Sequence, residues 1–195
     1  MPRNIHALLP FFMADGAPPG PGVLYMVGAS VDALYTLNTS TGVATRVGNA
    51  TNFGVGETLP TGLAGLGGVL YMVGTSVGAL HTLNTSTGVA TRVGRATDFG
   101  LEARFSASPS DLAELGGVLY MVDRNHRALY TLNTSTGVAT RVGRATDFGV
   151  GEAQPRGLAG LGGVLYVVGS SVNALDPPNT PNTCLLYTSP SPRDS

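Results

Sequence analysis

TLNTSTGVATRVG, residues Thr36 to Gly48, recurs without a change at Thr82–Gly94 and Thr131–Gly143. A second phrase, GVLYMV or GVLYVV, begins at Gly22, Gly68, Gly117 and Gly163. Its copies are 46, 49 and 46 residues apart. A fixed period of this size is typical of propeller blades and solenoid coils. The repeats therefore decide the architecture far better than they decide the function.

One repeat, Pro60–Glu102, divides into four short runs separated by turn residues. The run Val69–Val73 is continuously apolar, which is typical of a strand buried on both faces. The segment Asn84–Gly88 has the composition of a hairpin loop. The Asn84 side chain can cap the turn, and Gly88 can adopt the positive φ that it needs. The four expected strands are Thr61–Leu66, Val69–Val73, Ala79–Leu83 and Val89–Val93.

The pattern predicts an all-β fold, part of a β-propeller with four-stranded antiparallel blades. The small, glycine-rich first strand suits the crowded central channel. The fourth strand, which carries Arg46, Arg92 and Arg141, suits the solvated rim. A β-solenoid is the alternative, although its coils are usually shorter. The most buried segments are expected at Val69–Val73, Val118–Val122 and Val164–Val168.

The tyrosine-bearing second strand and the Asn-x-x-Thr-Gly hairpin resemble kelch-like and related propeller repeats of the form LYxLNxxTGxATxVG. The resemblance covers roughly Gly22 to Asn179 and implies a propeller. Kelch blades have a glycine pair after the second strand and a tryptophan near the fourth. Here the pair comes before the second strand, as at Gly67-Gly68, and the chain has no tryptophan.

The expected organisation has three parts. Residues 1–21 form an irregular segment that vaguely resembles a signal peptide. The repeat array occupies 22–175, with repeats near 22–67, 68–116 and 117–162 and a partial one at 163–175. Residues 176–195 are expected to lack regular structure because of their prolines. Within them, CLLYTSPSPRDS (184–195) resembles the translation of a sequencing-library adapter, so this part is expected not to be native. A truncated array leaves apolar blade faces bare and is expected to self-associate.

The composition of the chain narrows the classes of binding partner that can be expected. Charged residues make up 12% of the chain and the net charge is −1, which gives no electrostatic case for nucleic acid. No apolar run is long enough for a membrane span. The single cysteine, Cys184, lies in the suspected adapter, so disulfides and thiol catalysis are not expected. The sequence gives no localisation.

No residue stands out as catalytic, cofactor-binding or metal-ligating. The histidines His6, His81 and His126 lack metal-ligand spacing. Acidic residues recur in the inter-blade loops and could offer oxygen ligands to Ca²⁺, but solvated turns explain them better. The acidic pairs are Asp98 with Glu102 and Asp147 with Glu152, and the first copy has Asn52 with Glu57, so it lacks one carboxylate. Four N-glycosylation sequons are present, at Asn38, Asn49, Asn84 and Asn133. They predict glycosylation only if the protein is secreted.

The third repeat departs from the others in two loops, Glu102–Asp111 and Asp123–Arg127. Loops carry function in many folds, yet neutral drift in one blade explains these changes as well. The expected function is a non-enzymatic binding scaffold for a protein or glycan. The alternative is a fragment of a propeller enzyme whose catalytic residues lie outside this chain.

Overall fold

The computed structural model describes residues 23–28, 32–56, 59–101, 106–143, 148, 153–171 and 184–187. These residues form four antiparallel sheets, here called blades 1 to 4. Blade 1 contains β1 (Leu24–Gly28), β2 (Ala33–Leu37) and β3 (Ala44–Arg46). Blade 2 contains β4 (Pro60–Leu66), β5 (Val69–Gly74), β6 (Leu80–Leu83) and β7 (Ala90–Arg92). Blade 3 contains β8 (Pro109–Leu115), β9 (Val118–Asp123), β10 (Ala128–Leu132) and β11 (Ala139–Arg141). Blade 4 contains β12 (Ala153–Leu161), β13 (Val164–Ser171) and β14 (Cys184–Tyr187).

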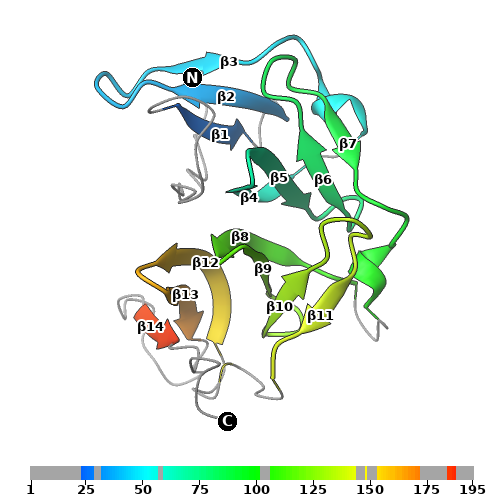
Figure 1. The fold of residues 1–195 in the computed structure, drawn as a ribbon, viewed down its shortest axis with the longest axis vertical. Coiled ribbons are helices and arrows are strands. Elements are labelled where there is room, and N and C mark those ends of the chain that lie inside the picture. Colours follow the sequence, from blue (N-terminus) through cyan, green and yellow to red (C-terminus); the bar gives the residue numbers. More distant parts are fainter. Residues whose placement is uncertain are drawn as a thin grey trace, which may run out of the picture.

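The blades follow one another around a common centre (Figure 1). The strands β4, β8 and β12 lie toward the middle, while β3, β7 and β11 lie at the periphery. Blades 2 and 3 each pair their four strands in chain order, as the sequence predicted. The fold is therefore part of a β-propeller, and the solenoid alternative is wrong.

The Asn-Thr-Ser-Thr-Gly hairpin shows why the repeated phrase folds the same way each time. The Asn84 Oδ1 atom accepts hydrogen bonds from the backbone N–H groups of Ser86 (2.9 Å) and Thr87 (3.0 Å). Gly88 takes a φ of +72° and donates its N–H to the Asn84 carbonyl at 2.8 Å. The same bonds recur in the hairpins at Asn38 and Asn133. The local sequence alone thus sets this turn.

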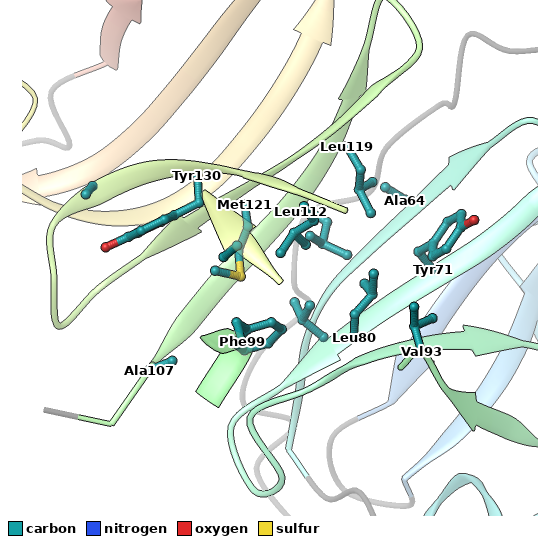
Figure 2. Close-up of a cluster of buried hydrophobic side chains, with 14 residues drawn as sticks. Ala64, Tyr71, Leu80, Val93, Phe99, Ala107, Leu112, Leu119, Met121 and Tyr130 are labelled. Atoms are coloured by element: carbon teal, nitrogen blue, oxygen red, sulfur yellow. The ribbon is translucent and has the colours of Figure 1, made fainter. Parts of the chain in front are cut away.

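The core lies between the blades, so the second strand of an inner blade is buried on both faces. Tyr71 and Val73 of β5 pack in one cluster with Leu112 and Met121 of blade 3 (Figure 2). Met72, which points the other way, packs against blade 1. Burial of the second strands is confirmed for β5 and β9 except at their first residues, and only in part for the expected segment Val164–Val168, where Val168 is 40% exposed. Val69 and Val118 are 39% and 37% exposed because they begin the strands at the hairpin end.

A buried phenylalanine anchors each connection between blades. Phe53 and Phe99 are fully buried although their φ values are +52° and +56°, in the left-handed region that L-residues rarely adopt. They form part of short 3₁₀ turns, η1 (Asn52–Gly54) and η2 (Asp98–Gly100). The Phe99 N–H donates to the Gly78 carbonyl at 3.2 Å. Phe148, in the third copy, also has positive φ and is 9% exposed. Burial of the ring offsets the backbone strain.

The expectation that no regular structure follows Asp176 is wrong for Cys184–Tyr187. These residues form β14 and pair with β13, where Val168 faces Cys184 and Leu165 faces Tyr187. Four apolar residues without a proline can pair with the open edge of β13, whereas the prolines that motivated the expectation lie on either side. The segment 1–21 and the rest of the tail lie outside the described residues, and the adapter origin of 184–195 stays a prediction.

At some contacts the backbones of neighbouring blades approach so closely that only glycine fits, although Asp111 takes the position of Gly62 in blade 3. A Cβ on Gly62 would lie 2.6 Å from the backbone nitrogen of Leu112 in the next blade. A Cβ on Gly94 would overlap the carbonyl oxygen of Thr136 in the next hairpin, and Gly48 meets Thr87 in the same way. The backbones themselves therefore form the interface at these points.

We expect Gly94→Ala to destabilise the protein more than Gly143→Ala. Both glycines end the same phrase and have positive φ, +60° and +67°, so each alanine carries about 1–2 kcal/mol of backbone strain. A Cβ on Gly143 meets nothing within 4 Å. The overlap at Gly94 should add about 1–3 kcal/mol. Urea unfolding at one protein concentration measures both, and equal losses would contradict the close-contact interpretation.

Candidate functional site

The polar departures of blade 3 gather at one end of the β8–β9 hairpin. Pro109 pairs with Asp123 and Asp111 pairs with Val122, with a bulge between them. The corresponding positions of blade 2 are Gly62 and Gly74. Two carboxylates thus replace two glycines at the place where β8 begins and β9 ends.

Asp123 is fully buried and organises the turn that follows β9. Its Oδ2 accepts the Ser108 N–H at 2.6 Å, and its Oδ1 accepts the His126 N–H at 2.8 Å. The His126 Nδ1 also lies 2.8 Å from Oδ1. Among the described residues, these contacts of the carboxylate are all with nitrogen atoms, which satisfies a buried acceptor. Asp123 therefore joins the turn to the segment that enters β8.

His126 and Asn125 extend this network to the surface. The Asn125 Nδ2 donates to the Ser106 carbonyl at 2.9 Å, and the Arg124 N–H donates to the Ser108 carbonyl at 2.9 Å. The His126 side chain is 19% exposed and meets the Tyr130 ring edge-on, with centroids 6.3 Å apart. Burial, and next the charge of Asp123, raise the pKa of the Tyr130 phenol, while Arg141 opposes the shift. The imidazole is thus fixed in place by a carboxylate below it and a ring beside it.

Asp111 has a different role, since it connects blades 3 and 4. Its Oδ2 accepts the Leu158 N–H of β12 at 2.8 Å, and its Oδ1 accepts the N–H of Leu112 at 2.8 Å. Loss of solvation on burial raises the pKa of this carboxyl well above its ordinary value, and the two hydrogen bonds oppose that shift. Next to it, the buried Ser110 Oγ has no hydrogen-bond partner among the described residues.

The turn itself carries positive charge. It reads Asp-Arg-Asn-His-Arg (123–127), where blade 2 has Gly-Thr-Ser-Val-Gly (74–78). Arg127 keeps the positive φ, +47°, that Gly78 has at +57°, so the backbone of the turn is the same. The Arg124 Nε is buried without a hydrogen-bond partner within the described part of the chain. This turn can bind an anionic group through its guanidinium and imidazole N–H donors.

The other histidines do not join this cluster. His81 lies on β6, is 1% exposed, and takes the strand position that Tyr130 has in blade 3. Burial, then the nearby charge of Arg92, lower the pKa of His81, while a backbone hydrogen bond with Ala79 raises it. His6 lies outside the described residues.

Neither the acidic loop pairs nor the sequons are shown to form a binding or modification site. Glu57, Glu102, Asp147 and Glu152 all lie outside the described residues, so their pairs cannot be placed. Within the described ranges, no three His, Cys, Asp or Glu side chains are grouped to hold a metal ion. Asn38, Asn84 and Asn133 are exposed, and each uses its side-chain oxygen to hold its own hairpin, as turn propensity predicts. The described part contains no helix long and apolar enough to cross a membrane.

Sequence reasoning noticed both variant loops but missed what their residues do. In the sequence, Asp111 stands out only as the last residue of a variant loop. Its hydrogen-bond partner, Leu158, lies 47 residues away in the chain. Asp123 and His126 are three residues apart, and an aspartate followed at i+3 by a histidine in a turn could have indicated their hydrogen bond. The signal was the loss of two glycines that the other blades keep.

The comparisons with known proteins place the chain among β-propellers. No family model matches the sequence, and no curated protein matches it. Among solved structures, the chain is similar to virginiamycin B lyase from Staphylococcus aureus (TM-score 0.51, 12% identity, 88% of this chain and 53% of that one). It is also similar to aldose sugar dehydrogenase from Streptomyces coelicolor (0.54, 14%, 84% and 57%) and to a chain of a nidogen/laminin complex (0.51, 15%, 77% and 55%). The chain spans about half the length of these proteins.

Two expectations need correction. The expectation that this is not an enzyme is wrong as a conclusion from the sequence, because the similar propellers include a lyase and a dehydrogenase as well as a protein of a complex. The inner strands are apolar at Gly62–Leu66 in blade 2 and Gly157–Leu161 in blade 4, whereas β8 of blade 3 contains Asp111. The propeller resemblance is confirmed, but kelch-like specifically is not supported.

We expect the stability of the protein to depend on pH through Asp111. Because its pKa is raised in the folded state, its contribution is fully present below the ordinary carboxyl pKa of about 4 and is lost as pH rises through the raised value. Asp111→Asn keeps an acceptor for the Leu158 N–H and removes the charge. The difference in unfolding free energy between variant and wild type should therefore move in favour of the variant as pH rises from about 4 to 8. Urea unfolding across that range measures it, and a constant difference would contradict the assignment.

Proposed function

We propose that this chain is part of a propeller binding scaffold, and that the turn Asp123–Arg127 of blade 3 recognises an anionic group on a protein or glycan partner. The observation that carries the proposal is the contrast with blade 2, where the same backbone turn holds no charged residue. The proposal concerns binding at this turn, and it is compatible with a catalytic role of a longer protein.

The turn has the rigidity that selective binding requires. Asp123, Arg124 and Asn125 are each hydrogen-bonded to the segment Ser106–Ser108. A ligand therefore meets donors that are already oriented, and little conformational entropy is lost when it binds. The Asp123 carboxylate, 2.8 Å from the His126 Nδ1, also holds the imidazole in one orientation.

The charge pattern indicates the chemistry of the ligand. Arg124, His126 and Arg127 lie within four residues of a chain whose net charge is −1. Their positive charge is therefore local, and it suits a small anionic group, such as a carboxylate or sulfate, better than a polyanion such as nucleic acid. Arginine is the side chain that matches planar carboxylates through paired N–H donors.

We expect replacement of residues 123–127 by Gly-Thr-Ser-Val-Gly, the blade 2 turn, to abolish anion binding while the fold is kept. The probes are a short peptide with a single glutamate and a monosulfated disaccharide, and binding is measured by calorimetry at low salt. Wild type should bind one of them, with affinity that falls as salt screens the charges, and the replacement should weaken it at least about tenfold, about 1.4 kcal/mol.

The matched control is Arg95→Ala, which removes one exposed positive charge from the connection after β7. It should bind as wild type does if the blade 3 turn is the site. Equal binding by the turn-replacement protein, or loss of binding in the Arg95 variant alone, would contradict the proposal.

A further inference from the structure

We infer that the uncovered faces of blade 1 and blade 4 bind each other between two copies of this chain, so that two chains close one ring. Blades 1 and 4 lie at the two ends of the arc in Figure 1. Each end face consists of the same residue types that blades 2 and 3 bury against each other. The internal interface therefore serves as the template for the contact between copies.

The outer face of blade 1 repeats the face that blade 3 presents to blade 2. In blade 3 this face consists of Leu119, Met121, Tyr130, Leu132 and Ala139, all of them 7% exposed or less. The aligned residues of blade 1 are identical: Leu24, Met26, Tyr35, Leu37 and Ala44. Here the first four are partly exposed and Ala44 is exposed. Blade 1 therefore shows to the outside a surface that blade 3 buries.

The outer face of blade 4 repeats the face that blade 2 presents to blade 3. In blade 2 it is formed by Gly62, Ala64, Leu66, Tyr71 and Val73. The aligned residues of blade 4 are again identical: Gly157, Ala159, Leu161, Tyr166 and Val168. Val73 is fully buried whereas Val168 is 40% exposed, and Leu161 is 68% exposed. Apolar side chains of this size are normally covered in a soluble assembly.

The two apolar faces are complementary to each other. Their residues are the counterparts of Leu119 and Met121 on one face and of Tyr71 and Val73 on the other, which belong to one buried cluster (Figure 2). None of the ten aligned residues is charged, so no buried charge opposes the contact. A copy that packs its blade 4 on another copy's blade 1 recreates contacts that already exist inside the chain.

The size of the four described blades favours a closed pair over an open chain of copies. A portion equal to 88% of this chain covers 53% of virginiamycin B lyase, a propeller protein. Two copies thus supply about the length of one such ring. A two-fold arrangement buries both end faces of both copies, whereas a filament leaves one face bare at each end.

Light scattering coupled to size-exclusion chromatography tests the inference on the full chain. Wild type should have twice the monomer mass of 19.9 kDa. Met26→Asp damages only the blade 1 face and Val168→Asp only the blade 4 face, so each variant alone should be monomeric. An equimolar mixture should regain the two-chain mass, because the intact blade 4 of the first variant can pack on the intact blade 1 of the second.

The matched control is Thr45→Asp. Thr45 is exposed, and its counterparts Thr91 and Thr140 remain exposed although blades 2 and 3 are stacked, so this position lies outside the interface. It should leave the two-chain mass unchanged. If an aspartate variant loses its β-sheet circular dichroism, the alanine variants Met26→Ala and Val168→Ala are used instead. Each should raise the dissociation constant of the two-chain assembly at least tenfold.

Three results would overturn the inference. A monodisperse wild-type monomer would mean that the end faces await further blades of a longer chain. Association that neither variant disrupts would place the contact on another surface. Failure of the mixture to recover, with both variants folded, would show that the two faces do not pair.

Discussion

Backbone contact between neighbouring blades is the constraint on which the rest of this structure depends. Where Gly62 meets Leu112, and where Gly94 meets Thr136, there is no room for a side chain on the glycine. The distance between blades is therefore fixed by main chain, and the apolar residues of the second strands fill the space that remains. A repeat that keeps its glycines and its hairpin stacks on any neighbour that does the same, which explains why the phrase from Thr36 to Gly48 recurs unchanged.

Such stacking leaves the connecting turns free to differ. Blade 3 keeps every strand of the repeat but has carboxylates at two glycine positions and a charged turn after β9. Asp123 is satisfied by nitrogens of its own turn and of the segment before β8, so its burial stabilises a local shape. Asp111 is satisfied from the next blade, through Leu158, and so couples the two blades in a way that glycine does not. A buried carboxylate without these partners would be strongly destabilising.

The strands of the repeat and its hairpin could be predicted from the sequence because their causes are local. Apolar runs bounded by glycines placed β5 and β9, and Asn84 with Gly88 defined the turn between β6 and β7. The roles of Asp111 and Asp123 could not be predicted, because a residue's partner across a blade interface depends on stacking that the sequence does not state. The strand β14 was missed for a similar reason, since it depends on the free edge of β13. The apolar inner strands of blades 2 and 4 do not represent the whole array, because β8 of blade 3 contains two carboxylates.

The most direct test of the stacking account is removal of one whole blade. Deletion of residues 49–94 joins Gly48 to Arg95, one repeat of 46 residues further on, and brings blade 3 against blade 1. If glycine contacts and shared apolar faces are sufficient for stacking, the shortened protein unfolds in urea in a single cooperative transition. Its m-value then falls roughly in proportion to the surface of the missing blade. Loss of cooperative unfolding would show that the blades are not interchangeable, and that stacking needs contacts specific to each pair.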